Sequence, residues 1–310
     1  MTINSPTSHF ISAPDGLRLH ARDYGPRSAQ GLNGQALPVV CLPGLARSGS
    51  DFEALATALA NDPERPRRVL ALDYRGRGQS SYDRDPANYS FQVEIADVLA
   101  VLTALDCAPA IFVGTSRGGI LTMLMAALRP SAIAAAVLND IGPVIEPKGL
   151  MRIKGYVGKL PQPRSYDEAG EILRRLFSAQ FPAQTAEDWL ASARRTFKEV
   201  DGRLVPDYDV ALAKTLEGVD FEKPLPPLWA QFDALANVPV MVIRGENSDL
   251  LSAATVEAMA ARRAAPENMA ARRTAPGRAL ETVVVPDQGH APLLNEPDTI
   301  ARIADFVARV

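Results

Sequence analysis

The sequence predicts an α/β fold, in which a mostly parallel sheet carries helices on both faces and one helical segment is inserted. Six short apolar runs, rich in β-branched residues, alternate along the chain with segments of helical periodicity. The runs are continuously apolar, which is typical of parallel strands that are covered on both faces. The alternation of strands and helices stops once, between about residues 144 and 235, and then resumes. We therefore expect one sheet interrupted by one insertion.

Seven segments are expected to form strands. The first, residues 17–25, alternates polar and apolar residues, so we assign it to an antiparallel edge of the sheet. The remaining strands are expected at 37–43, 68–74, 110–116, 133–140, 238–245 and 280–287. Helices are expected between them, at about 51–61, 92–106, 117–129, 252–264 and 297–309.

The insertion is expected to be a helical cap domain. It spans residues 144–235, and residues 1–143 and 236–310 together form the predicted core domain. An apolar stripe at helical spacing predicts one helix of the cap, and a second helix is expected to start near Thr185. Three aromatic residues of this segment are candidates for lining an apolar substrate pocket, although such side chains also form the core of a cap: Phe177, Trp189 and Trp229.

Composition excludes several classes of function. The net charge is −3, with 33 basic and 36 acidic residues, so no basic excess points to nucleic acid as a partner. Two cysteines, Cys41 and Cys107, do not suffice for a disulfide framework or a metal cluster. Neither a secretory signal nor a bilayer-spanning apolar run is present, so we expect a cytoplasmic location. The octapeptide at 259–266 recurs at 269–276 and is interpreted as a local duplication in a connection.

The run Gly114-Thr115-Ser116-Arg117-Gly118 identifies a candidate nucleophile. It fits the pattern G-x-S-x-G, and it lies between a predicted strand and a predicted helix, as a nucleophile elbow requires. The turn is tight and strained, and a side chain at position 114 or 118 would clash with neighbouring backbone. Ser116 is therefore predicted to be a catalytic serine.

A serine hydroxyl needs a general base, and the chain has three histidines. His9 lies in an N-terminal segment that we expect to be frayed, and His20 lies in the edge strand, where a structural role is the default. His290 follows the last predicted strand on a glycine-containing loop, from which it can reach Ser116. His290 is therefore the candidate base.

The residues leave the orienting acid open between three carboxylates. Glu246 and Asp249 follow the penultimate strand, whereas Asp140 stands at the end of an earlier strand. Any of them, placed beside His290, would orient the imidazole and stabilise its charged form.

Taken together, the motifs resemble those of cap-bearing α/β-hydrolases, which include esterases, lactonases and cofactor-free haloperoxidases. The resemblance covers nearly the whole chain. It rests on "LPGL" at 42–45, "DYRGRGQS" at 73–80, "GTSRGG" at 114–119, "RGENSD" at 244–249 and "GHAP" at 289–292.

The resemblance implies an acid in a Gly-x-x-Asp loop after the penultimate strand. Counted from Gly245, that slot holds Ser248, and Asp249 follows it. We therefore predict that Asp249 is the catalytic acid and that Asp140 organises the backbone where the cap begins.

Two backbone amides are predicted to form the oxyanion hole. One is the N–H of Arg117, at the N-terminus of the helix that follows the nucleophile. The other is the N–H of Leu45, in a loop where relatives often have His-Gly and this chain has Pro43-Gly44. We expect the Arg117 side chain to form a salt bridge rather than to bind an acidic substrate.

The predicted function is serine hydrolysis of a small carboxylic ester or lactone, with no cofactor and no metal. A second hypothesis is a small-molecule receptor of the same fold that keeps the triad, since a fold does not settle a function. A third is hydrolysis of a carbon–carbon bond by the same residues. Oligomeric state is not predicted.

Overall fold

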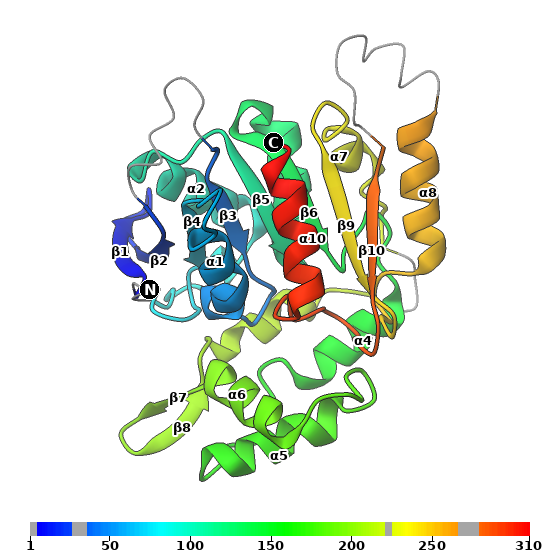
Figure 1. The fold of residues 1–310 in the computed structure, drawn as a ribbon. Helices are drawn as coiled ribbons and strands as arrows, with labels where there is room; N and C mark the ends of the chain where they lie inside the picture. Colours follow the sequence, from blue (N-terminus) through cyan, green and yellow to red (C-terminus); the bar gives the residue numbers. More distant parts are fainter. Residues whose placement is uncertain (1–4, 27–35, 221–224, 266–278) are drawn as a thin grey trace.

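The computed structural model describes residues 5–26, 36–220, 225–265 and 279–310. At its centre lies an eight-stranded sheet with the order β1-β2-β4-β3-β5-β6-β9-β10 (Figure 1). The strands are β1 (Thr7–Ser12), β2 (Arg18–Tyr24), β3 (Val39–Leu42), β4 (Val69–Asp73), β5 (Ala110–Thr115), β6 (Ile133–Asn139), β9 (Val240–Gly245) and β10 (Glu281–Val285).

Strands β4, β3, β5, β6, β9 and β10 are parallel, and β2 pairs antiparallel with β4. Their carboxyl ends therefore meet at one edge of the sheet, where α/β proteins place their functional loops. This confirms the six parallel strands and the antiparallel segment at 17–25.

The amino-terminal segment contains a strand that the sequence pattern did not predict. Strand β1 pairs antiparallel with β2 and forms the outer edge of the sheet. His9 lies in this strand, with its Nε2 atom 3.1 Å from the carboxylate of Asp23. The expectation that His9 belongs to a frayed tail is therefore wrong, because pairing with a neighbouring strand orders a segment that has little apolar content of its own.

Helices cover both faces of the sheet. Helices α2, α3 and α8 pack on one face, through side chains such as Val98, Leu121 and Met259, whereas α1 and α10 pack on the other, through side chains such as Leu55 and Phe306. Figure 1 shows α10 crossing the sheet next to α1. The helices of the core are α1 (Glu53–Ala60), α2 (Phe91–Ala104), α3 (Arg117–Leu128), α8 (Ala253–Ala264) and α10 (Pro297–Ala308), with short 3₁₀ helices η1 (Gly49–Phe52), η2 (Pro86–Asn88) and η3 (Pro130–Ala132).

The segment inserted between β6 and β9 has a small apolar core of its own. Helices α5 and α6 pack together with the hairpin β7–β8, around side chains that include Trp189 and Phe197 (Figure 1). Thr185 caps α6 in a capping box with Asp188, as expected for a helix starting there. The hairpin was not predicted. The elements are α4 (Pro147–Tyr156), α5 (Tyr166–Phe177), α6 (Ala186–Thr196), β7 (Phe197–Val200), β8 (Arg203–Pro206), η4 (Val210–Leu216) and α7 (Trp229–Asp233).

The second copy of the repeated octapeptide, at 269–276, lies outside the described residues. Among the helices that the structure describes, none is both long enough and apolar enough to span a bilayer.

Candidate active site

Ser116 occupies a sharp turn between strand β5 and helix α3. Its backbone has φ 51° and ψ −112°, a left-handed conformation that is strained for a residue with a side chain. The Ser116 N–H donates to the carbonyl of Asn139 at 3.0 Å, which ties the turn to the end of the neighbouring strand β6. The turn therefore has the geometry of a nucleophile elbow.

Two glycines permit this turn because backbone segments touch there. A Cβ atom at Gly114 would lie 2.5 Å from the backbone carbon of Gly118, and one at Gly118 would lie 2.1 Å from the carbonyl oxygen of Leu42. Both distances are far below van der Waals contact. The steric reason that the sequence motif implied is thus confirmed.

Replacing Gly118 by alanine is expected to destabilise the fold by about 3 kcal/mol, because the added methyl group meets rigid backbone. The matched control is Gly155→Ala in helix α4, where an added Cβ meets nothing within 4 Å. That change is expected to be neutral or stabilising, by up to about 1 kcal/mol. Urea unfolding of the three proteins measures both effects. Equal stability of Gly118→Ala and the parent would contradict the close approach.

His290 connects Ser116 to a carboxylate. Its Nε2 atom lies 2.9 Å from Ser116 Oγ, and its Nδ1 atom lies 2.8 Å from Asp140 Oδ2. The side chain of His290 is only 5% exposed. The structure thus brings together the two residues predicted as nucleophile and base, with an acid on the far side of the imidazole.

Asp140 stands at the carboxyl end of β6 and is completely buried. Its Oδ1 atom accepts the N–H of Gly245 at 2.8 Å, and its Oδ2 atom accepts the hydroxyl of Ser248 at 2.6 Å in addition to the His290 contact. Three hydrogen bonds to a buried carboxylate compensate for the water that it has lost. They also hold the carboxylate in place against the imidazole.

The prediction of Asp249 as the acid that contacts His290 is wrong. Asp249 instead forms a two-pronged ion pair with Arg152 of α4, with both N–O distances at 2.7 Å. Burial raises the pKa of Asp249, but the hydrogen bond and charge of Arg152, acting together with the charge of His290, lower it more, so the net pKa is lowered. The third carboxylate considered, Glu246, is exposed and accepts the N–H of Asp287.

Strand order explains this correction. Strand β6 lies directly beside β5, whose end carries Ser116, whereas β9 is one strand further away. Asp140 follows β6 without a gap, so its side chain reaches the imidazole from the centre of the sheet. In the loop after β9, Ser248 turns toward Asp140 and Asp249 turns toward α4. The sequence did contain one sign of this error, because the Gly-x-x-Asp slot counted from Gly245 holds Ser248 and not an aspartate.

The two amides predicted for the oxyanion hole have no acceptor among the described residues. The N–H of Arg117 belongs to the first turn of α3, where helix amides lack partners within the helix. The N–H of Leu45 lies in the loop after β3, which borders the same cavity as Ser116. Both amides are thus available to an oxygen bound there.

The Arg117 side chain forms the expected salt bridge. Its Nε atom lies 2.6 Å from Glu94 Oε2, and its Nη2 atom donates to the carbonyl of Tyr89 at 3.0 Å. The guanidinium also stacks on the ring of Phe91. Glu94 is fully buried and pairs with Arg77 as well, so this cation belongs to an internal ion network and not to the cavity.

A cavity of about 640 Å³ opens over Ser116 and His290. Its walls come from the loops at the carboxyl edge of the sheet and from α4, α5 and α6 of the inserted segment. Much of the lining is apolar. The apolar side chains contributed by the inserted segment include Ile153, Val157, Leu160, Leu173, Phe177, Phe181 and Trp189.

Two of the three aromatic residues proposed as pocket lining do border this cavity, namely Phe177 and Trp189. Trp229 does not. It lies in α7, where its ring makes an edge contact with Phe232 and carries the guanidinium of Arg262. The expectation for Trp229 is wrong because the returning chain places α7 against the core beside α3, away from the cavity.

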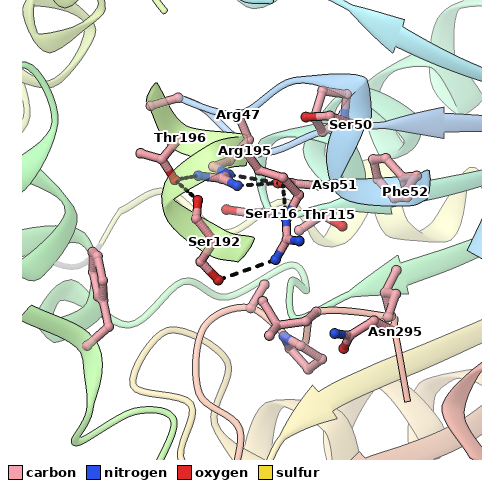
Figure 2. Close-up of a pocket in the computed structure, with 18 of the residues that line it drawn as sticks. Arg47, Ser50, Asp51, Phe52, Thr115, Ser116, Ser192, Arg195, Thr196 and Asn295 are labelled. Atoms are coloured by element: carbon pink, nitrogen blue, oxygen red, sulfur yellow. Dashed lines mark hydrogen bonds and ion pairs between the residues drawn. The ribbon is translucent and has the colours of Figure 1, made fainter. Parts of the chain in front are cut away.

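One wall of the cavity is charged (Figure 2). Arg47 and Arg195 lie on either side of Asp51, and Thr196 accepts a hydrogen bond from Arg47 at 2.6 Å. No sequence motif pointed to this cluster, because Arg195 comes from α6 whereas Arg47 and Asp51 come from the region after β3. Among the described residues, no group of three or more His, Cys, Asp or Glu side chains is arranged to hold a metal ion.

A buried carboxylate, an imidazole and a serine hydroxyl in a hydrogen-bonded chain form an arrangement suited to nucleophilic catalysis. The imidazole can accept the hydroxyl proton, and the carboxylate stabilises the resulting imidazolium. Helix α3 begins directly after Ser116, so its dipole would favour negative charge that develops beside this serine.

Comparison with known proteins agrees with this geometry. The 3-hydroxybutyrate-oligomer hydrolase of Cupriavidus necator is 33% identical over 314 aligned positions, which cover 97% of this chain and 98% of that protein. The 2-(acetamidomethylene)succinate hydrolase of Mesorhizobium japonicum is 26% identical over 85% of each chain. The crystal structure of an alpha/beta hydrolase from Novosphingobium aromaticivorans superposes with a TM-score of 0.83 at 40% identity, covering 99% of both chains.

A family model also matches most of the chain. The model of the alpha/beta hydrolase family matches residues 39–303, which include β3, the nucleophile elbow, the inserted segment and the histidine loop. The match thus takes in every element that borders the cavity. The chain belongs to the alpha/beta hydrolase family.

Proposed function

We propose that the protein is a serine hydrolase that cleaves a small carboxylic ester or lactone by acyl transfer. The observation that carries this proposal is the hydrogen-bonded chain Ser116–His290–Asp140, whose serine faces a largely apolar cavity. Asp140 takes the role that the sequence pattern had assigned to Asp249.

In the proposed first half-reaction, Ser116 Oγ attacks the carbonyl carbon while His290 Nε2 takes the hydroxyl proton. Asp140 holds the imidazole by its Nδ1 atom and stabilises its positive charge. The N–H groups of Leu45 and Arg117 donate to the tetrahedral oxyanion. The intermediate then collapses, His290 gives its proton to the leaving alkoxide, and the alcohol departs from the acyl-enzyme.

In the second half-reaction, His290 takes a proton from a water molecule as that water attacks the acyl-enzyme carbonyl. The new tetrahedral intermediate collapses, Ser116 Oγ leaves, and His290 returns the proton to it. The acid product is released, and every proton that His290 accepts is given back within the cycle. The proposed reaction uses no group beyond the chain and water.

The ester class is supported by the relative from Cupriavidus necator, whose name specifies oligomers of 3-hydroxybutyrate. Hydroxy acids in such oligomers are joined by ester bonds. The cavity volume of about 640 Å³ falls in the range typical of small-molecule sites. We therefore propose small esters as substrates, and we propose that residues 144–235 act as a cap over the site while 1–143 and 236–310 form the core.

Two measurements on the purified protein test the proposal. p-Nitrophenyl butyrate, short lactones and short aliphatic esters should be hydrolysed. A fluorophosphonate should add covalently at Ser116, shown by peptide mass spectrometry, and should stop turnover in proportion to labelling. Ligand binding without turnover of any ester or lactone would favour the receptor hypothesis. Activity restricted to carbon–carbon substrates would replace the ester class.

A further inference from the structure

The charged wall of the cavity holds two guanidinium groups and a single carboxylate in ion-pair contact with them. Arg47 binds Asp51 through two hydrogen bonds, one of them 2.7 Å long between Nε and Oδ2, and donates a third to Thr196. Arg195 approaches the same carboxylate only to 3.9 Å and makes a 3.3 Å hydrogen bond to Ser192. One carboxylate thus serves two guanidinium groups.

The two arginines differ in how well they are compensated. Burial acts to lower the pKa of both guanidinium groups, because it disfavours their charged form. For Arg47 the contacts with Asp51 outweigh burial and raise its pKa, whereas the pKa of Arg195 stays lowered. Asp51 and Arg195 keep 28% and 29% of their side-chain surface exposed, and both border the cavity. Arg195 therefore has hydrogen-bonding capacity directed at a space that a substrate would fill.

This cluster lies near the proposed nucleophile. A Cβ atom built on Gly44 would be 3.5 Å from Arg47 Cγ and 3.9 Å from Ser116 Cβ, so both side chains flank the same glycine. Figure 2 shows Arg195, Asp51 and Ser116 around one cavity. A group bound by Arg195 would belong to the molecule whose carbonyl meets Ser116.

We infer that Arg195, supported by the Arg47–Asp51 pair, binds a free carboxylate of the substrate. The substrate would then be an ester that carries one carboxylate a few bonds from the scissile carbonyl. This inference rests on the proposed function, because it takes Ser116 as the reacting residue. An arginine suits this role since its planar fork donates two parallel hydrogen bonds to one carboxylate.

The charge of the cluster favours a monoanion. Arg47, Asp51 and Arg195 together carry one net positive charge, and Glu53, exposed at the cavity border, adds a negative charge that acts on Arg195 without ion-pair contact. A dianionic phosphate would leave the cluster with one uncompensated negative charge and would also be repelled by Glu53. A single carboxylate restores neutrality within the cluster, and the apolar remainder of the cavity accommodates an aliphatic chain.

The test compares matched acids and amides. On the alcohol side, the substrates are 3-(butyryloxy)butanoate and its carboxamide. On the acyl side, they are the mono-p-nitrophenyl ester of glutaric acid and its carboxamide. For at least one pair, the parent protein is expected to show a higher kcat/KM for the acid than for the amide.

Arg195→Met keeps an unbranched apolar stem at this position and removes the charged guanidinium group. It is expected to lower the acid-over-amide ratio of kcat/KM by about 10- to 100-fold, mostly through KM, as for loss of a hydrogen bond to a charged group. The matched control is Arg194→Met, at an exposed arginine of the same helix that stacks on Tyr166. Arg194→Met should keep the ratio of the parent. No acid preference in either pair, or an equal effect of both variants, would overturn the inference.

A binding measurement separates this inference from the proposed function. Ser116→Ala should bind 3-(butyryloxy)butanoate in a calorimetric titration, and Ser116→Ala/Arg195→Met should bind it at least about 10-fold more weakly. This result supports the carboxylate site even if no substrate is turned over. Hydrolysis that depends on Ser116, combined with equal binding by the two variants, overturns the carboxylate site and leaves the proposed function intact.

Discussion

Replacing Ser116 by alanine is expected to lower kcat on p-nitrophenyl butyrate by about 10³- to 10⁶-fold, the range seen when a serine nucleophile is removed. The change deletes the only atom that His290 Nε2 contacts toward the cavity among the described residues. It removes no packing of consequence. Thermal unfolding should therefore show a fold at least as stable as that of the parent, and a steady-state assay should show the loss in kcat.

A second serine in the same cavity provides the control. Ser50 borders the cavity, and its hydroxyl lies 2.7 Å from that of Ser48 instead of near an imidazole. Ser50→Ala is expected to change kcat by less than about threefold, since surface-type substitutions of this kind have small effects. A Ser116→Ala protein that retains a tenth of the parent activity would remove Ser116 from the mechanism.

Replacing Asp140 by asparagine is expected to lower kcat by about 10³- to 10⁴-fold, because an amide of the same shape cannot stabilise the imidazolium and favours the wrong tautomer of His290. The same substitution at Asp249 should lower kcat by less than about 10-fold. Asp249 pairs with Arg152 and has no described hydrogen bond to His290. Steady-state kinetics of the two variants on one ester decides between the two carboxylates.

Asp249 is expected to contribute to the stability of the fold. Asp249→Asn removes the partner of the part-buried Arg152 guanidinium and is expected to cost about 2 kcal/mol at neutral pH. The folded pKa of Asp249 is lowered, so its stabilising effect is present above the unfolded pKa and is lost as the pH falls through the folded pKa. The stability difference between the parent and Asp249→Asn should therefore shrink in acid. If Asp249→Asn lowered kcat more than Asp140→Asn, the prediction of Asp249 as the catalytic acid would be restored.

The elements of the core were predictable because each depends on a local pattern. A continuous apolar run such as 110–116 has to be covered on both faces, and the helix that follows it is signalled by its own periodicity. The elbow at Ser116 depends on residues close to it in the chain, since a side chain at Gly114 would meet the backbone of Gly118. For the same reason, the starting point of α6 at Thr185 could be identified from its capping residues.

The features that were missed depend on partners distant in sequence. Strand β1 carries little apolar content, and its order comes from pairing with β2. Trp229 looks like a pocket residue from composition, yet α7 packs beside α3. Arg195 and Asp51 lie far apart in the sequence. They meet only because the folded chain places α6 over the loop that follows β3.

The amino-acid pattern was sufficient to predict the α/β class, the candidate nucleophile Ser116 and its candidate base His290. The first two follow from residues adjacent in the chain, and His290 is the one histidine that follows the last predicted strand. The choice of Asp140 over Asp249 required the folded sheet. Strand β6 lies between β5 and β9, so its end is the one that faces both Ser116 and His290. Lateral strand order is set by the packing of the whole chain, and no local spacing encodes which carboxylate reaches the imidazole.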